Sequence, residues 1–262
     1  MRHSLAVFLL LTLVACSSDP SKEDNLTADE LYSKAQESMQ DNSYEKAIKE
    51  FEKLQSRYPY GRHAQQAQME IAYAYFKHDE AVPAIAALER FEKMYPNSAH
   101  LDYVLYLKGL VYFNENINSL IGTIFKQDPA ERDPASLRES FDTFKELLTR
   151  FPDSKYAPDA RLRSQYLLNT LASSDIQVAS YYLRRGAYVA AVNRAKSVLV
   201  NYPQTPQTRD ALQILVQAYG AMGITKLRDD TQRVLDLNVA KDGMKPVVRE
   251  MPQSLPWWNF WS

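Results

Sequence analysis

The residues able to do acid–base, nucleophilic or metal chemistry are few in this sequence, and they lack the spacing that such chemistry needs. Four histidines stand far apart, and none belongs to an HExxH metal-binding motif. No serine occupies a GxSxG nucleophile elbow. We therefore expect His63, His78 and His100 to be surface residues. The sequence nominates no catalytic group, which favours a non-enzymatic binding scaffold.

Composition excludes further classes of protein. With 31 Lys and Arg against 32 Asp and Glu, the chain lacks the basic surface of an electrostatic nucleic-acid binder. A single Cys excludes a disulfide scaffold and a Cys-rich zinc site. Seven scattered glycines supply neither a GxGxxG turn nor a GxxxxGK phosphate loop. Carboxylates such as Glu45, Glu50 and Glu52 have the spread that is typical of solvated helix faces. Low Gly and abundant Ala, Leu, Lys, Glu and Gln predict a mostly helical chain.

The only cysteine follows a segment that is typical of a secretory signal. Residues 1–15 have a basic start, an apolar stretch and the small residue Ala15, and the stretch is shorter than the about 20 residues that span a bilayer. Leu13-Val14-Ala15-Cys16 resembles the lipobox of bacterial lipoproteins, in which the Cys becomes the acylated first residue. An ordinary signal peptide with an incidental Cys is the alternative.

The lipobox resemblance implies N-acyl and S-diacylglycerol groups on Cys16 and no other cofactor. Several acyl chains hold a protein on a membrane without spanning it. Ser17, rather than Asp, follows the Cys, and this implies the outer membrane rather than retention in the inner one. Residues 16–26 are predicted to be the lipidated Cys and a flexible linker.

An internal repeat organises the chain after residue 26. The small residues Ala35, Ala72 and Gly109 lie 37 and again 37 positions apart. Second helical segments end in an aromatic–Pro step at Tyr58-Pro59, Tyr95-Pro96, Phe151-Pro152 and Tyr202-Pro203. This pattern predicts an all-α, tetratricopeptide (TPR)-like superhelical solenoid of about five helix-turn-helix repeats. An unrelated helical bundle would show the apolar periodicity without the recurring Pro and small residues.

Spacing between the Pro positions divides the solenoid. Residues 27–152 form an N-terminal half of three repeats, whose third repeat carries an insertion at about 114–133. Residues 153–238 form a C-terminal half, in which a long helix over 158–185 precedes repeats four and five. Counting back from each Pro places small and large packing residues at Ala47 and Phe51, Ala84 and Leu88, Ser140 and Phe144, and Ala191 and Ala195.

The tail, residues 239–262, holds three prolines and every Trp of the chain. The aromatic cluster Trp257, Trp258, Phe260 and Trp261 either docks onto a groove of the solenoid or binds a partner or the lipid interface. Both interpretations remain open.

TPR solenoids bind extended peptides or helices on a concave surface that is formed chiefly by the first helix of each repeat. The first helices here are rich in aromatic and amide residues, among them Tyr32 and Tyr73. We expect most of these side chains to pack inside the repeats and a minority to line a groove.

Several runs resemble one family in particular, the BamD (also ComL) lipoproteins, over about residues 13–238. The runs are Arg57-Tyr58-Pro59-Tyr60-Gly61, Asp102-Tyr103-Val104-Leu105-Tyr106, Arg132-Asp133-Pro134, and Arg185-Gly186-Ala187-Tyr188-Val189-Ala190-Ala191-Val192-Asn193-Arg194. The resemblance implies a subunit of the β-barrel assembly (BAM) machinery, anchored at the periplasmic face of the outer membrane of a Gram-negative bacterium. Its implied partners are the POTRA region of BamA, other BAM lipoproteins and unfolded outer-membrane β-barrel proteins.

Carried over residue by residue, the resemblance makes Arg194, with Asn193, the candidate contact to BamA POTRA. Tyr58 and Gly61, with Tyr32 and Tyr73, become the candidate substrate contacts. A solvated cation at Arg194 and a packing role for Tyr58 are the structural alternatives. A periplasmic TPR adaptor that organises peptidoglycan or division proteins would share the repeats but not the insertion or the 185–194 run. An envelope enzyme would need a catalytic domain, for which the residues outside the repeats are too few.

Overall fold

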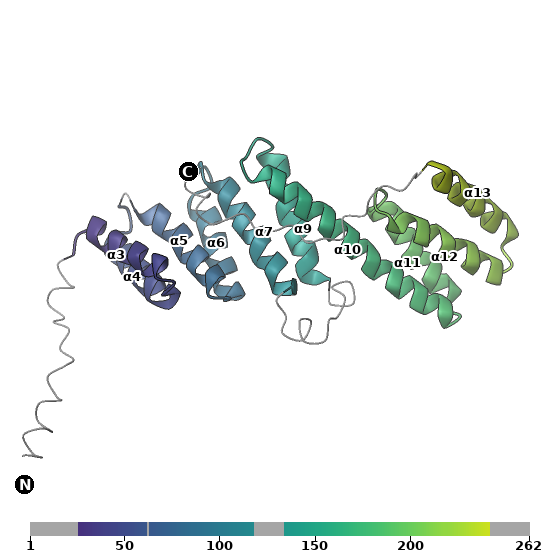
Figure 1. Ribbon diagram of the computed structural model, residues 1–262, viewed down its shortest axis with the longest axis horizontal. Coiled ribbons are helices and arrows are strands. Elements are labelled where there is room, and N and C mark those ends of the chain that lie inside the picture. The colour runs from purple at the N-terminus through teal and green to yellow at the C-terminus, as the bar shows by residue number, and fades with distance from the viewer. Residues whose placement is uncertain (1–25, 62, 118–133, 242–262) are drawn as a thin grey trace, which may run out of the picture. The chain divides into compact units, whose positions relative to one another are not determined.

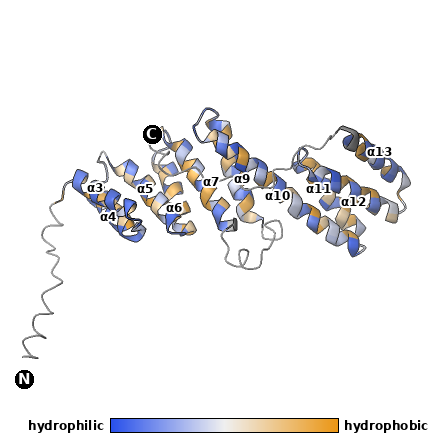
Figure 2. Cartoon of the chain, in the orientation of Figure 1, coloured by the Kyte–Doolittle hydropathy of each residue, from blue (hydrophilic) through white to orange (hydrophobic). Residues whose placement is uncertain are grey.

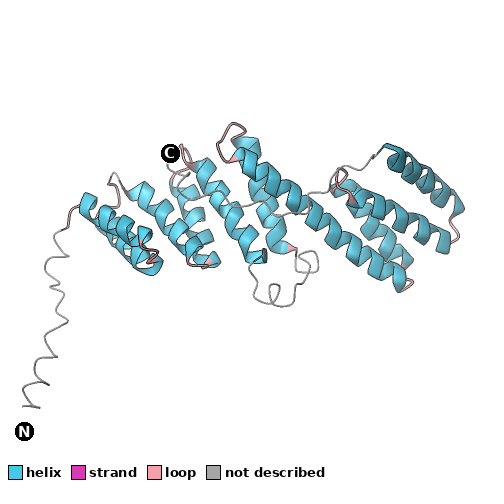
Figure 3. Cartoon of the chain, viewed as in Figure 1, coloured by secondary structure: helices cyan, strands magenta, loops and turns pink. Residues whose placement is uncertain are grey.

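The computed structural model describes residues 26–61, 63–117 and 134–241, of which 116–117 and 239–241 are described by their backbone alone. Every regular element in these ranges is an α-helix (Figures 1 and 3). The helices are α3 (Ala28–Gln40), α4 (Tyr44–Arg57), α5 (Ala64–Lys77), α6 (Ala81–Met94), α7 (Leu101–Ile117), α9 (Ala135–Arg150), α10 (Ala157–Arg184), α11 (Tyr188–Asn201), α12 (Gln207–Ala221) and α13 (Thr225–Lys241). The all-α, TPR-like fold predicted from the sequence is confirmed.

Each aromatic–Pro step ends a helix in the same way. Tyr58, Tyr95, Phe151 and Tyr202 follow α4, α6, α9 and α11, with φ between −129° and −132°. A Pro disfavours helical φ/ψ for the residue before it, so the helix stops there. In all four turns the backbone N–H three residues after the aromatic residue donates to the aromatic residue's carbonyl. The four matching turns confirm the repeat read from the sequence.

The tight turns inside the helix pairs are alike too. Asn42, Asp79, Gly186 and Gly223 all have positive φ, and each stands two residues after the end of α3, α5, α10 or α12. A left-handed residue at this position is a common helix stop, and Gly or Asn adopts it at the lowest cost. At the other end of α3, the Thr27 and Glu30 side chains form a capping box.

Compact packing divides the chain between His78 and Asp79. In the N-terminal unit, α4 packs against both α3 and α5. In the C-terminal unit, α7 packs against α6 and α9, α10 against α9, α11 and α12, and α12 against α11 and α13. The sequence had placed the division at 152–153. Since α10 contacts α9 as well as α11, no break in packing occurs there.

Small residues allow the helices of a pair to approach closely, as the sequence pattern predicted. The eight packing residues counted back from the Pro positions are all fully buried. A Cβ on Gly109 of α7 would come within 2.5 Å of the Phe144 ring on α9, and Ser140 Oγ donates to the Gly109 carbonyl at 2.9 Å. Figure 2 shows hydrophobic and hydrophilic residues mixed along the helices, as expected where each helix buries one side.

The long helix predicted over 158–185 is α10, which has 28 residues. Helix α7 continues to Ile117, so the first residues of the predicted insertion at 114–133 are helical. Residues 118–133 lie outside the described residues, as do the predicted signal 1–15, Cys16 and the Trp cluster of the tail. None of the described helices is long and apolar enough to cross a membrane.

Candidate functional site

Arg194 stands on α11 between the buried residues Ala191 and Ala195, at the margin of the helix face that packs inward. Its Nη1 donates to Oδ1 of Asp175 on α10 at 3.1 Å. The Asp175 side chain is only 8% exposed, whereas that of Arg194 is 40% exposed. A buried carboxylate therefore holds one side of the guanidinium, and the contact occupies one of its five N–H donors.

The pair and Arg138 act electrostatically on a third group, the Tyr202 hydroxyl. Burial raises the pKa of the Tyr202 hydroxyl and Asp175 raises it further, while Arg138 and Arg194 lower it. Arg138 is exposed on α9, and Tyr202 ends α11. Two guanidinium groups thus accompany one carboxylate, which leaves the cluster with an excess positive charge. A cluster with more guanidinium groups than carboxylates suits a further carboxylate from a partner, because the planar guanidinium can donate two parallel hydrogen bonds to it.

The outward side of α11 combines this charge with apolar surface. Asn193 and Lys196 are exposed, and Val189 and Val200 on the same helix are 63% and 76% exposed. Spacings of three to four residues put these four side chains on one stripe. We call this stripe together with Arg194 the α11 surface. The two valines are candidates that the sequence analysis missed, although their spacing from the buried Ala191 could have revealed them.

In the N-terminal unit, Tyr32 belongs to a polar network. Its ring stacks on His63 with the centroids 4.4 Å apart and lies 5.8 Å from the ring of Phe51. Gln36 Nε2 donates to Tyr32 Oη at 2.9 Å and to Glu70 Oε1 at 2.8 Å. Glu70 is 3% exposed, and burial raises its pKa to about 7. Burial, followed by the charge of Glu70, raises the pKa of Tyr32.

Two residues expected on the solvated surface lie in packed surroundings, so those expectations were wrong. His63 Nε2 is 2.6 Å from Asp29 Oδ1, and its side chain is 15% exposed. Glu50 is 8% exposed and accepts a hydrogen bond from Ser38 Oγ at 2.7 Å. Both are covered because neighbouring helices pack over them, which helix periodicity alone does not show. His78 and His100 are exposed, as predicted.

The other candidate substrate residues have structural partners. Tyr58 Oη donates to the Leu26 carbonyl at 3.2 Å, and the Gly61 N–H donates to the Tyr58 carbonyl at 3.1 Å. Tyr73 is 7% exposed, so it offers little surface. The same turn presents Tyr60, which is 99% exposed and which the sequence analysis did not nominate. Its position between Pro59 and Gly61, at the tip of the turn, was the available signal.

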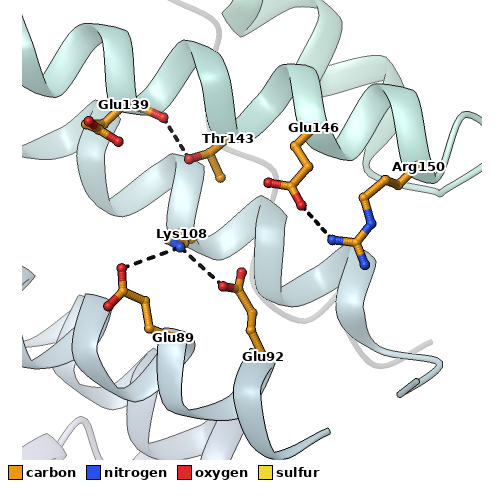
Figure 4. A network of polar contacts seen from close by, with 7 residues as sticks. All are labelled: Glu89, Glu92, Lys108, Glu139, Thr143, Glu146 and Arg150. Atoms are coloured by element: carbon orange, nitrogen blue, oxygen red, sulfur yellow. Dashed lines mark hydrogen bonds and ion pairs between the residues drawn. The ribbon is translucent and has the colours of Figure 1, made fainter. Parts of the chain in front are cut away.

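A separate polar cluster links α6 to α7 (Figure 4). Lys108 Nζ lies 3.6 Å from Glu89 Oε1 and 3.3 Å from Glu92 Oε2, and Figure 4 shows the ammonium pointing toward both carboxylates. The Lys108 side chain is 16% exposed. Burial lowers the pKa of Lys108, but the two carboxylates outweigh this effect and raise it. The cluster thus joins α6 to α7 by ion pairs.

Among the described side chains, no group of three His, Cys, Asp or Glu residues could hold a metal ion. Tyr106 and Arg163 both donate to Asp159, at 2.7 and 2.6 Å, in a buried triad of the C-terminal unit. Since all three groups are covered by packing, this triad is placed to join α7 to α10 rather than to meet a ligand.

Comparisons with known proteins agree with the resemblance. A family model described as YfiO, outer membrane lipoprotein, matches residues 24–235. Outer membrane protein assembly factor BamD of Neisseria meningitidis serogroup A is 41% identical over 263 residues, which cover 98% of each chain. BamD of Vibrio cholerae is 37% identical over 237 residues, 90% of this chain and 98% of that one. BamD of Haemophilus influenzae is 33% identical over 91% of each chain.

A solved structure of TPR-like repeats from a Podosopora anserina kinesin light chain aligns with 82% of this chain at 14% identity and a TM-score of 0.37. The family is established by the other comparisons. Its model spans most of the chain, and the BamD relatives align over nearly their whole length. The chain therefore belongs to the BamD (YfiO) family of outer membrane protein assembly factors.

Proposed function

We propose that this chain is a non-enzymatic scaffold subunit of the BAM machinery, anchored to the outer membrane by acyl groups on Cys16 and facing the periplasm. Its α11 surface docks to the POTRA region of BamA, and its N-terminal unit receives unfolded outer-membrane proteins. Other BAM lipoproteins complete the assembly. The observation that carries the docking site is the pairing of the 40% exposed Arg194 with the buried Asp175.

Docking at the α11 surface follows from the chemistry of its residues. A guanidinium already held on one side loses less conformational freedom when it binds a second carboxylate, so more of the interaction energy is kept. At about 100° per residue, exposed Val189 and Val200 lie roughly 120–140° around α11 from Arg194, so they add apolar contact beside the charged one rather than surround it. An acidic group on POTRA, flanked by apolar residues, is the partner that this surface fits.

The N-terminal unit offers a different kind of contact. Unfolded β-barrel segments alternate apolar and polar residues and are rich in aromatic side chains. Tyr60 at the tip of its turn presents a whole aromatic ring, beside a backbone fixed by the Gly61 to Tyr58 hydrogen bond. Tyr32, Tyr58 and Tyr73 have packing or hydrogen-bond partners within the unit, so we assign them a smaller share of direct substrate contact.

Co-purification from gently solubilised outer membranes tests the proposal. We compare the tagged wild-type chain with Arg194→Glu and with the matched control Arg209→Glu, which changes an exposed arginine of α12 in the same way. A β-barrel protein with POTRA domains should be recovered with wild type and with the control, and lost with Arg194→Glu. Recovery of cell-wall or division proteins instead would support the adaptor alternative.

The anchor has its own test. Cys16→Ala should move the chain from the membrane fraction to the soluble periplasmic fraction, with its helical circular dichroism unchanged. Membrane fractionation of Cys16→Ala in cells depleted of BAM partners would contradict the lipid anchor. A Tyr60→Ala variant should cross-link less to an unfolded outer-membrane protein while it still binds BamA.

A further inference from the structure

The last described helix, α13, carries apolar side chains on its exposed side. Leu227, Val234 and Leu237 are 44%, 46% and 62% exposed. Spacings of seven and three residues place them on one stripe of the helix. Leu235, which is 8% exposed, belongs to a different side of α13. We call Leu227, Val234 and Leu237 the α13 stripe.

The stripe lies where the repeat pattern would continue. In the described C-terminal unit, α11 packs between α10 and α12, whereas α13 packs against α12 alone among its major contacts. Repeats in a solenoid bury apolar surface against their neighbours, and the terminal repeat needs a polar outer side to remain soluble. The exposed side of α13 is mixed, because these three large aliphatic residues stand among charged ones such as Lys226, Asp229 and Asp236. An apolar segment over the aliphatic residues would complete the end of the solenoid as a neighbouring repeat does.

The chain itself supplies an apolar segment at this point. Residues 242–262 follow α13 directly, and the twelve residues from Met251 to Ser262 contain no charged side chain. Leu255, Trp257, Trp258, Phe260 and Trp261 are among them. The family model ends at residue 235. The segment thus lies beyond the residues that the family model matches, although the alignment with BamD of Neisseria meningitidis, which covers 98% of this chain, extends into it.

Length and connection favour a fold-back. From Leu227 to Leu237 the stripe extends about 15 Å at 1.5 Å per residue, a distance that about five residues of extended chain cover. Gly243 and Pro246 stand between α13 and the apolar residues, and both residue types favour a reversal of direction. An attached segment also acts at high effective concentration, which a separate partner does not.

We propose that residues 251–261 lie against the α13 stripe and cap the solenoid in place of a further repeat. This proposal is independent of the docking of α11 to BamA. It assigns the Trp cluster an intramolecular role, with Trp and Phe rings covering Leu227, Val234 and Leu237.

Tryptophan fluorescence tests it directly, because all three Trp residues of the chain are in this segment. We use the whole mature chain, residues 16–262, with Cys16→Ser so that no detergent is needed. Wild type should emit at the short wavelengths of buried Trp and resist acrylamide quenching. Val234→Asp/Leu237→Asp should shift the emission to longer wavelengths and raise the quenching constant, with the helical circular dichroism unchanged. The matched control is Val189→Asp/Val200→Asp, which places the same charges on exposed aliphatic residues of α11 and should emit as wild type does.

Four results would overturn the proposal. The first is wild-type Trp emission at the wavelength of free Trp, and the second is protected Trp that is indifferent to Val234→Asp/Leu237→Asp. Protection that disappears on dilution would identify a second copy of the chain as the occupant. Protection that arises only after phosphatidylethanolamine–phosphatidylglycerol vesicles are added would assign the segment to the lipid interface.

Discussion

Arg194 Nη1 and Asp175 Oδ1 lie 3.1 Å apart, and the two partners differ fivefold in exposure, at 40% and 8%. Arg194 consequently has two roles in one position. It compensates a carboxylate that α10 keeps out of water, and it presents the rest of its guanidinium at the α11 surface. Any substitution of Arg194 therefore affects stability as well as the proposed docking, and the two effects have to be separated.

Neutral substitutions of Arg194 and Asp175 separate the effect on stability from the effect on docking. Arg194→Gln leaves Asp175 buried without its cation, so we expect the free energy of unfolding to fall by about 1–3 kcal/mol. Asp175→Asn/Arg194→Gln removes both charges and should recover most of that loss, because no unpaired charge remains. Neither variant should bind BamA as wild type does. Urea denaturation and co-purification of the same two proteins measure stability and docking separately. Restored binding in the double variant would show that Arg194 acts on the fold alone.

Asp175→Asn by itself tests the positioning role. Asn can still accept a hydrogen bond, but it no longer attracts the guanidinium electrostatically. Arg194 is present in this variant, so docking should weaken less than with Arg194→Gln while the fold stays intact. Equal loss of docking in the two single variants would mean that the orientation of Arg194 contributes as much as its charge.

Glu70 should make the N-terminal unit less stable as the pH rises. Its pKa is raised to about 7 from 4.5, mainly by burial, so the folded state binds its proton more tightly than the unfolded state does. The contribution is full below about pH 4.5 and is lost as the pH rises through about 7, with an upper limit of about 3 kcal/mol at 1.36 kcal/mol per unit. Glu70→Gln keeps the hydrogen-bonding shape without the charge. Its stability relative to wild type should therefore increase from pH 4.5 to pH 8 in urea titrations. A constant difference between the two proteins across this range would contradict the shifted pKa.

Lys108 should stabilise the fold by offsetting the repulsion between the carboxylates of Glu89 and Glu92. Lys108→Met leaves Glu89 and Glu92 facing the same site without a cation (Figure 4), and we expect a loss of about 1–2 kcal/mol. Because the pKa of Lys108 is raised in the folded state, this contribution is complete below the ordinary value of 10.5 and is lost as the pH rises through the higher folded-state pKa. Lys108→Met/Glu92→Gln should restore part of the stability, because one of the two charges is gone. Thermal unfolding of the three proteins at pH 7 and low salt measures these differences in stability. If Lys108→Met is as stable as wild type, the cluster is a solvated ion pair that does not stabilise the fold.

The repeat frame could be predicted from the sequence because its determinants are local. A Pro after an aromatic residue ends a helix, and a small residue such as Ala191 permits close packing, wherever the repeat stands. Pairings between helices could not be predicted in the same way. Asp175 lies in the middle of a helix, where a carboxylate ordinarily indicates a solvated side, and its burial arises only when α11 and α12 pack on α10. Glu50 was misjudged for the same reason, since α3 brings Ser38 over it.

The candidate site residues show the same contrast between what local sequence reveals and what depends on the fold. Arg194 was found through a resemblance between runs of sequence, and the structure adds its buried partner. Tyr60 was overlooked because the aromatic–Pro pattern draws attention to Tyr58, which packs, rather than to the next aromatic residue, which the turn exposes. Exposure at a turn tip depends on backbone geometry, here the hydrogen bond from the Gly61 N–H to the Tyr58 carbonyl, and residue type alone does not give it.

Gly109 should resist even the smallest substitution. A helical Gly→Ala change ordinarily stabilises by up to about 1 kcal/mol, but a Cβ at residue 109 would meet three atoms of the Phe144 ring at 2.5–2.8 Å. Because the ring is rigid and fully buried, α7 and α9 must separate, and we expect Gly109→Ala to lower the unfolding free energy by about 1–3 kcal/mol. Gly220→Ala is the matched control, since its Cβ would meet only the flexible Arg228 side chain at 3.5 Å and should be neutral or mildly stabilising. Gly109→Ala/Phe144→Leu should recover part of the loss by making room at the contact. Thermal and urea unfolding of the four proteins decides the matter, and a Gly109→Ala protein as stable as Gly220→Ala would show that α7 and α9 are not held this closely in solution.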